Sequence, residues 1–143
     1  MTSLPSFGIR AARLEEAAAV LDVWTRAGAE PSISDDVESI ERLIAHDPGA
    51  LLIAEGEDRI VGTVIATWDG WRGGIYRLAV TPERRRTGVA TRLVDAAERR
   101  LRELGAPKVA ALVLDAQDHA VAFWQMRGYE PDDRLTRWVR SFR

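Results

Sequence analysis

The chain has 143 residues, a length that suits one domain with a full hydrophobic core and is too short for two ordinary domains. It contains no cysteine, which excludes disulfides, thiolate metal sites and a covalent acyl-cysteine intermediate. The formal net charge of −2 gives no general attraction to nucleic acid, and the apolar runs are too short to cross a bilayer. Because the N-terminus lacks a basic region followed by an apolar segment, we expect a cytoplasmic protein.

The first half of the chain is predicted to hold a strand, two helices and a pair of strands. Apolar residues recur at helical spacing from Leu14 to Trp24, and Gly28 ends that helix. Two later apolar runs are joined by the polar residues 56–59, which is typical of a hairpin. The expected elements are a strand over 7–11, helices over 14–24 and 35–45, and strands over 50–55 and 60–68.

The second half is predicted to alternate between strands and helices. A long amphipathic helix ends at Gly105, and Pro107 prevents its continuation. The strands on either side of this helix form a β–α–β unit and should be parallel neighbours. The expected elements are strands over 75–80 and 109–114, helices over 88–104 and 117–127, and a closing strand over 135–142.

Residues 80–93 carry most of the functional information. A strand ends at Val80, three arginines follow, and the segment Thr87-Gly88-Val89-Ala90 opens the long helix. Unpaired backbone N–H groups at a helix start, next to side-chain cations, suit a phosphate group. A run of arginines is more often a solvated loop. Here the small residues Gly88 and Ala90 favour anion binding, because they let a phosphate approach the backbone.

The spacing Arg85-x-x-Gly88-x-Ala90 is the (Arg/Gln)-x-x-Gly-x-(Gly/Ala) signature, and the chain here resembles the GNAT superfamily of acyl-CoA-dependent N-acyltransferases. The order of elements from Ile9 to Val139 is also similar, and residues 117–129 resemble a second landmark, a helix that ends in Gly-(Phe/Tyr). The resemblance implies an α/β (α+β) fold. Its central sheet would be mixed and mostly antiparallel, with a V-shaped splay between two parallel strands and helices on both faces. We expect one such domain over residues 1–143.

The same resemblance implies a site for acetyl-CoA. The superfamily holds the pyrophosphate of coenzyme A with this loop, which here offers the N–H groups of residues 86–91. The splayed strand pairs with pantetheine, and the Leu78 N–H is then placed to polarise the thioester carbonyl. His46 and His119 are isolated and fit no ligand spacing, so no metal site is expected. The implied cofactor-binding residues are Leu78, Ala79, Val80, Arg85, Arg86, Thr87, Gly88, Val89, Ala90, Thr91, Gln117 and Trp124.

The sequence departs from the superfamily in its acid and base. Residues 73–80 contain no Asp or Glu, so Gly74 lies on a strand that usually carries a carboxylate, and Trp124 replaces the usual tyrosine. The attacking amine must lose a proton, because a lysine-type amine has a pKa of about 10.4. Asp69 is a candidate for the base or the amine anchor, and Tyr76 is an alternative proton donor. Proximity of the bound amine and thioester would supply much of the rate, and a water chain would remove the proton.

The acceptor site is predicted near the turn that precedes the strand over 75–80. Asp-Gly and Gly-Gly pairs are ordinary hairpin chemistry, but two tryptophans and an arginine in one tight turn favour a contact surface. The acidic stretch 30–38 would favour a cationic amine, although an N-terminal helix cap explains part of that acidity. The predicted acceptor-binding residues are Trp24, Trp71 and Arg72.

We therefore predict an N-acetyltransferase that passes an acetyl group from acetyl-CoA directly to a primary amine of a small molecule, an amino acid or a peptide. One alternative is a non-catalytic acyl-CoA-binding module that regulates a partner, which the missing acid and base favour. Another is an acyltransferase toxin that acts on charged transfer RNA, although the acidic balance counts against it. A homodimer through residues 135–142 or the exposed tryptophans is a further expectation.

Overall fold

The computed structural model describes residues 6–113 and 118–143. The chain forms two compact units, Met1–Ala111 and Leu112–Arg143. All described strands lie in the first unit, and the second unit contains the helix α4 (Asp118–Met126). The single domain expected over the whole chain stays a prediction.

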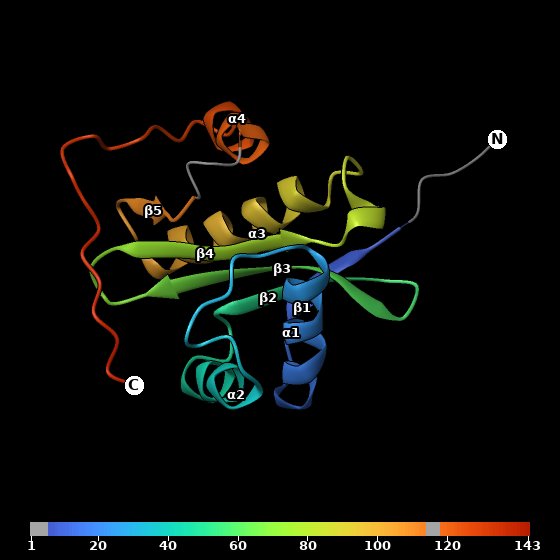
Figure 1. Cartoon of the computed structure of the whole chain (residues 1–143). Coiled ribbons are helices and arrows are strands. Elements are labelled where there is room, and N and C mark those ends of the chain that lie inside the picture. The colour runs from blue at the N-terminus through green and yellow to red at the C-terminus, as the bar shows by residue number, and fades with distance from the viewer. Residues whose placement is uncertain (1–5, 114–117) are drawn as a thin grey trace. The chain divides into compact units, whose positions relative to one another are not determined.

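A five-stranded sheet forms the centre of the described part of the first unit (Figure 1). Its strand order follows the chain order, and every neighbouring pair is antiparallel except the last, which is parallel. The parallel pair confirms the predicted β–α–β unit. The strands are β1 (Gly8–Ala11), β2 (Leu51–Gly56), β3 (Arg59–Trp68), β4 (Gly73–Val80) and β5 (Val109–Ala111).

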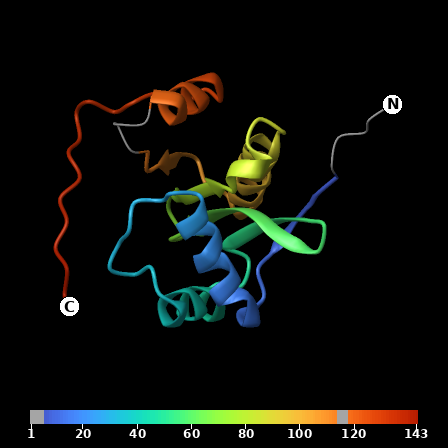
Figure 2. The same ribbon diagram turned by 45° about the vertical axis from the view of Figure 1, so that its right-hand side comes forward.

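Helices cover both faces of this sheet (Figures 1 and 2). A mixed sheet between two helical layers confirms the predicted fold class. No helix among the described residues is both long enough and apolar enough to cross a membrane. Helices α1 (Ala17–Arg26) and α2 (Val37–His46) lie on one face, and α3 (Val89–Leu104) lies on the other.

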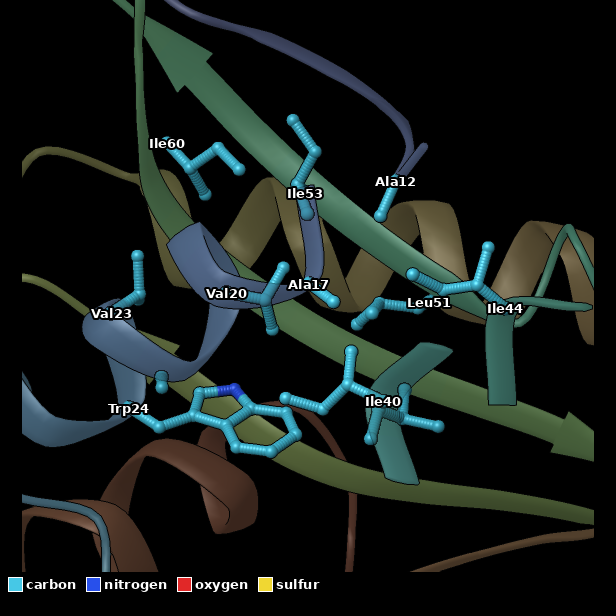
Figure 3. Packing of buried hydrophobic residues seen from close by; sticks show 12 residues of the cluster. Ala12, Ala17, Val20, Val23, Trp24, Ile40, Ile44, Leu51, Ile53 and Ile60 are labelled. Carbon is cyan, nitrogen blue, oxygen red and sulfur yellow. The ribbon is translucent and has the colours of Figure 1, made fainter. Parts of the chain in front are cut away.

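One cluster of buried side chains fills the space between the sheet and the helices α1 and α2 (Figure 3). Val20 and Trp24 come from α1, Ile40 comes from α2, and Leu51 comes from β2. Burial of a large apolar side chain contributes roughly 1.5–3 kcal/mol. The cluster therefore fixes α1 against the sheet, and with it the start of the segment 27–36 that connects α1 to α2.

Helix α3 packs directly against two glycines of the sheet. A Cβ atom on Gly62 would lie 2.9 Å from Val89 Cγ1, and a Cβ atom on Gly73 would lie 2.9 Å from Leu101 Cδ1. A larger residue at either position would push the helix outward, because packed interiors leave little room for extra atoms. The close approach therefore fixes α3, including its N-terminal end, on this face of the sheet.

Strand β4 contains a β-bulge in its middle. Its register with β3 shifts between Thr63 and Ile65, so that Arg77 and Leu78 together face one residue of β3. Arg77 has a φ angle of 52°, in the left-handed region that residues other than glycine rarely adopt. The bulge resets the alternation of side chains along β4 and turns the peptide group that joins these two residues.

The predicted closing strand over residues 135–142 is wrong. These residues have no regular secondary structure, and Trp138 is 90% exposed. The apolar residues are Leu135, Trp138, Val139 and Phe142, and this spacing does not alternate with period two. No single face of a strand could therefore collect them. The predicted homodimer through this segment stays a prediction.

Two further boundaries differ from the sequence prediction. The strand expected over 109–114 is shorter, because β5 ends at Ala111 and residues 112 and 113 have no regular structure. Residues 114–117 lie outside the described part of the chain. The helix expected over 117–127 is present as α4, which ends one residue earlier than predicted.

Candidate active site

The segment between β4 and α3 presents a row of unpaired backbone N–H groups. After Val80 the chain forms a short 3-10 helix (η2, Pro82–Arg84), and α3 begins after Gly88. Gly88 has a φ angle of 87°, a left-handed conformation that glycine adopts without strain. The N–H of Arg92 donates to Gly88 O at 3.1 Å, but the N–H groups of residues 86–91 have no acceptor in the described part of the chain. These groups are free to bind an anion.

Two arginines near this loop tie it to other parts of the first unit. Arg85 Nη2 donates to Ala27 O at 2.8 Å, just after the end of α1. Arg92 Nη1 donates to Phe7 O at 3.2 Å, and its guanidinium carbon lies 4.6 Å from the centroid of the Phe7 ring. Both side chains hold the loop in place, and both add to the positive potential around it.

The other two arginines of the loop differ in burial. Arg84 is 5% exposed, and its Nη2 lies 3.8 Å from Glu57 Oε1 in the turn between β2 and β3. The Arg84 carbonyl accepts a hydrogen bond from Thr87 Oγ1, which closes the loop locally. Arg86 is exposed and has a φ angle of 64°, and its side chain makes no hydrogen bond or ion pair within the described residues. Arg86 is therefore free to turn toward a phosphate group at the loop.

The outer edge of β4 is unpaired beyond its first residues. Its parallel pairing with β5 covers Gly73 to Ile75, and no described strand pairs with this edge further along. At the other edge, Thr81 N–H donates to Val61 O at 2.9 Å. Because N–H groups alternate in direction along a strand, those of Leu78 and Val80 point away from β3. They can therefore pair with a ligand that lies along this edge.

The bulge in β4 is held by contacts from other elements. Arg77 O accepts a hydrogen bond from Thr63 Oγ1 at 3.0 Å. The Thr63 hydroxyl oxygen in turn accepts a hydrogen bond from Trp24 Nε1 at 2.9 Å. Arg77 Nη2 donates to both carboxylate oxygens of Asp35, at 2.8 and 2.6 Å, and Arg77 Nη1 donates to Glu30 O at 3.0 Å. Sequence reasoning missed Arg77 and Thr63. The available signal was that β4 carries a single charged residue.

Tyr76 and Trp24, both predicted to serve the chemistry or the acceptor, lie in different environments. Tyr76 is exposed next to the bulge, and its hydroxyl would lie 3.0 Å from a Cβ atom on Gly74, so the ring leans back along β4. Trp24 is 4% exposed, with its indole in the core (Figure 3). A buried indole cannot line an open acceptor site, and in this structure Trp24 supports the bulge instead.

The turn that joins β3 to β4 is held by its own hydrogen bonds. Asp69 Oδ1 accepts from the N–H groups of Trp71 and Arg72, at 2.8 and 2.7 Å. The bond from Arg72 and then the bond from Trp71 lower the pKa of Asp69. Trp71 is exposed, and the Arg72 guanidinium lies 4.3 Å from its ring centroid. This turn precedes Gly73, and the strand rise puts Leu78 roughly 17 Å further along, so Asp69 does not lie beside Leu78.

The acidic stretch 30–38 is partly used by the fold. Asp35 pairs with Arg77, and Asp36 caps α2 by accepting a hydrogen bond from Ser39 N–H at 2.7 Å. Glu38 also pairs with Arg42 at 3.3 Å, so the helix cap accounts for one of these acids and ion pairs account for two others. Less of this charge is left to attract a cationic acceptor than the composition suggested.

The remaining predicted site residues lie outside the first unit. Gln117 is not among the described residues. Trp124 belongs to α4, where its ring packs edge-to-face against Phe123 and Tyr129 at centroid distances of 5.5 and 4.8 Å. Contacts of Gln117 and Trp124 with a cofactor stay predictions. No group of three or more potential metal ligands occurs in the described part of the chain.

Two solved structures share the fold of this chain. The paia N-acetyltransferase of Thermoplasma acidophilum, in complex with coenzyme A, is 17% identical, with 90% of this chain and 92% of that chain covered and a TM-score of 0.75. A predicted acetyltransferase of Clostridium acetobutylicum with acetyl-CoA is 18% identical, with 94% and 96% covered and a TM-score of 0.73.

Sequence comparison identifies the family as well as the fold. An acetyltransferase of Pectobacterium atrosepticum is 34% identical over 128 residues, which cover 90% of this chain and 91% of the relative. Residues 17–129 match the family described as the acetyltransferase (GNAT) family. This range includes strands β4 and β5 and the loop between β4 and α3. The chain therefore belongs to the acetyltransferase (GNAT) family.

Proposed function

We propose that this acetyltransferase transfers an acetyl group from acetyl-CoA directly to a primary amine of a small molecule, an amino acid or a peptide. The observation that carries the proposal is the row of unpaired N–H groups over residues 86–91, which follows the unpaired edge of β4. Two structural neighbours hold coenzyme A or acetyl-CoA, which supports this choice of acetyl donor.

The loop would bind the pyrophosphate of the donor. Each charge-assisted hydrogen bond from an N–H group contributes roughly 1.5–3 kcal/mol, and the N-terminus of α3 adds about 0.3–1 kcal/mol. Several such bonds support micromolar affinity, which corresponds to about 8 kcal/mol. The exposed guanidinium of Arg86 would add a charge contact, and the free N–H groups of Leu78 and Val80 would pair with the pantetheine arm.

The acetyl transfer itself would take place near Leu78. The amine nitrogen attacks the thioester carbonyl carbon, the C–S bond breaks, and the coenzyme A thiolate leaves. Negative charge develops on the carbonyl oxygen before the C–S bond breaks, and the N–H of Leu78 would stabilise it. Overall, one proton leaves the amine nitrogen and one proton reaches the departing sulfur.

Two side chains are candidates for a part in these proton transfers. Tyr76 is two residues from Leu78 and exposed, so its hydroxyl would serve as the proton donor once the ring turns away from Gly74 toward Leu78. Asp69 has a lowered pKa and lies at the far end of β4, which suits an anchor for a cationic acceptor better than a base beside the reacting atoms. With Trp71 and Arg72 it would form an exposed rim for the acceptor, and a water chain would take the proton of the amine.

A matched pair of substitutions at Gly88 tests the loop. Asn and Asp have similar size, tolerate a left-handed backbone better than other residues, and can both cap α3. Only Asp adds a negative charge beside the pyrophosphate. We expect Gly88→Asp to weaken acetyl-CoA binding roughly 10- to 100-fold relative to Gly88→Asn in a calorimetric titration. Equal affinities of the two variants, at unchanged melting temperatures, would mean that the pyrophosphate binds elsewhere.

A second candidate function is a non-catalytic acyl-CoA-binding module. The position and lowered pKa of Asp69 favour this module, because they make Asp69 a poor general base for a reaction at Leu78. Residues 73–80 contain no Asp or Glu that could take its place. Release of free thiol from acetyl-CoA separates the two candidates when it is measured against spermidine, tyramine, kanamycin and a peptide with a free α-amine. Tight binding of acetyl-CoA without thiol release on any of these amines would support the module.

A further inference from the structure

Arg77 is an unusual residue to find at the bulge of β4. Its φ angle of 52° is left-handed, a conformation that costs free energy for any residue with a Cβ atom. Such strain persists only where the surrounding contacts outweigh it. Arg77 also has the long side chain needed to reach another segment of the chain, whereas a glycine would have given the same backbone without strain.

The contacts of the Arg77 side chain come from the connection between α1 and α2. Both carboxylate oxygens of Asp35 accept from Arg77 Nη2, and Glu30 O accepts from Nη1. The guanidinium carbon also lies 5.2 Å from the centroid of the Trp24 ring. The pair is largely shielded, because the side chains of Arg77 and Asp35 are only 20% and 13% exposed. The segment 27–36 is thus joined to the bulge by an ion pair with two hydrogen bonds and by a third hydrogen bond to a backbone carbonyl.

The backbone of the bulge is held from the other side. Arg77 O accepts a hydrogen bond from Thr63 Oγ1, which is fixed in turn by Trp24 Nε1. The carbonyl of Arg77 and the N–H of Leu78 belong to one planar trans peptide group, so they point in opposite directions. A carbonyl held toward Thr63 therefore directs the Leu78 N–H toward the unpaired edge of β4.

We propose that Asp35, Arg77 and Thr63 are positioning residues that lock the peptide group between Arg77 and Leu78, so that the Leu78 N–H faces the thioester carbonyl. This inference rests on the proposed function. It assigns to the segment 27–36 a direct effect on the acetyl-transfer step, because that segment supplies the partner of Arg77. None of the three side chains needs to touch the acetyl group.

Asp35→Asn is the first variant to make, because it keeps the size of the side chain and weakens the ion pair. We expect kcat to fall roughly 10- to 100-fold, since a misdirected oxyanion donor costs about that much. The dissociation constant of acetyl-CoA should stay within about twofold, because the loop over 86–91 is unchanged. A split between kcat and binding is the signature of a positioning role.

Glu16→Gln is the matched control. Glu16 pairs with Arg10 through two hydrogen bonds of 2.8 and 2.7 Å and accepts from the N–H three residues earlier, at Arg13. Asp35 has the same arrangement, with a hydrogen bond from Ser32 N–H at 3.1 Å. Each variant neutralises one carboxylate of such a pair, at the bulge in one case and at β1 in the other, although Arg10 keeps a second acidic partner, Glu55. We expect the control to lose stability without a change in kcat.

Two substitutions of Arg77 separate its backbone from its side chain. Arg77→Gly permits the left-handed φ angle but removes the ion pair, so kcat should fall as in Asp35→Asn. Arg77→Lys keeps a cation and should retain more of the activity than the glycine variant. If Arg77→Gly has the wild-type kcat, the side chain does not position the Leu78 N–H and the proposal is overturned.

A readout that needs no acceptor separates this inference from the proposed function. The order parameter of the Leu78 N–H, measured by NMR relaxation in the free protein, should fall from about 0.85 to below about 0.6 in Asp35→Asn and stay high in Glu16→Gln. If the wild-type protein acetylates no amine, the proposed function fails and this comparison alone decides. A rigid Leu78 N–H in Asp35→Asn, or equal losses in the variant and its control, would overturn the positioning role.

Discussion

The bulge in β4 and the loop that opens α3 both expose backbone N–H groups, but their backbone shapes have different origins. The shape of the loop depends on local sequence: Gly88 adopts its left-handed backbone freely, and Thr87 closes the turn onto a carbonyl three residues earlier. Arg85 and Arg92 then tether the formed loop to Ala27 and Phe7. The bulge depends on distant residues, because Arg77 is held by Thr63, 14 positions away, and by Asp35, 42 positions away. The shape of a loop with free N–H groups can thus be encoded in a few consecutive residues, whereas the direction of one N–H at the bulge requires support from distant parts of the fold.

The most severe way to break the distant support is Thr63→Val. Thr63 is fully buried, and its hydroxyl links Trp24 Nε1 to Arg77 O. Valine has the same shape but leaves the buried Trp24 N–H and the partly buried Arg77 carbonyl unpaired, so we expect the free energy of unfolding in urea to fall by roughly 2–4 kcal/mol. Thr63→Ser keeps the hydroxyl and should recover most of that loss. Similar midpoints for the two variants would show that this link does not support the bulge.

The sequence predicted the loop and its helix well for the same physical reason. The residues that shape the loop (85–90) and the glycine that ends α3 act on backbone within one helical turn of themselves. A short stretch of sequence is therefore enough to predict both. The bulge and the residues that hold it could not be predicted, because nothing near Arg77 in sequence indicates that Asp35 is its partner. The error over 135–142 has a related cause: four apolar residues indicated burial, but a strand also needs a neighbour, and sequence spacing does not supply one.

The ion pair between Arg10 and Glu16 lies away from the bulge, and acid titration measures how much it contributes to stability. Glu16 pairs with Arg10, and the side-chain hydrogen bond from Arg10 is the main cause that lowers the pKa of Glu16 from 4.5 to about 2. Because the pKa is lower in the folded state, the stabilisation is complete above the unfolded value of 4.5 and disappears as the pH falls toward 2. We expect a loss of about 1 kcal/mol in this window, after solvent screening is considered.

The measurement for this prediction is the free energy of unfolding in urea at a series of pH values between 5 and 2, for the wild-type protein and Glu16→Gln. The variant should be less stable at pH 5 and should approach the wild-type protein as the acid limit is reached. Parallel curves would mean that the ion pair contributes no pH-dependent stability. Because Arg10 keeps Glu55 as a second partner, the size of the effect sets a lower bound on the stability that Asp35→Asn should lose apart from its effect on kcat.

The smallest expected effects come from glycine at strained positions that no side chain supports. Arg86 has a φ angle of 64° and no partner within the described residues, so Arg86→Gly should raise the free energy of unfolding by roughly 0.5–1 kcal/mol. The same substitution at Arg77 removes an ion pair as well and should not stabilise. Arg86 and Arg77 have similar φ angles, but only Arg86→Gly should stabilise the protein. Urea unfolding of the two variants measures the difference in their free energies of unfolding.

Asp58→Gly provides the reference for Arg86→Gly, because it relieves a similar strain far from the loop. Glu57 and Asp58 form the turn between β2 and β3 with φ angles of 54° and 61°, and glycine is favoured at the second position of such a turn. We expect a gain of about 0.5 kcal/mol in unfolding free energy, since Asp tolerates this conformation better than most residues. Acetyl-CoA affinity should not change in Asp58→Gly, whereas it should fall several-fold in Arg86→Gly if the guanidinium contacts a phosphate. Unchanged affinity in both variants would mean that the Arg86 side chain does not contact a phosphate and that the backbone N–H groups bind the anion without it.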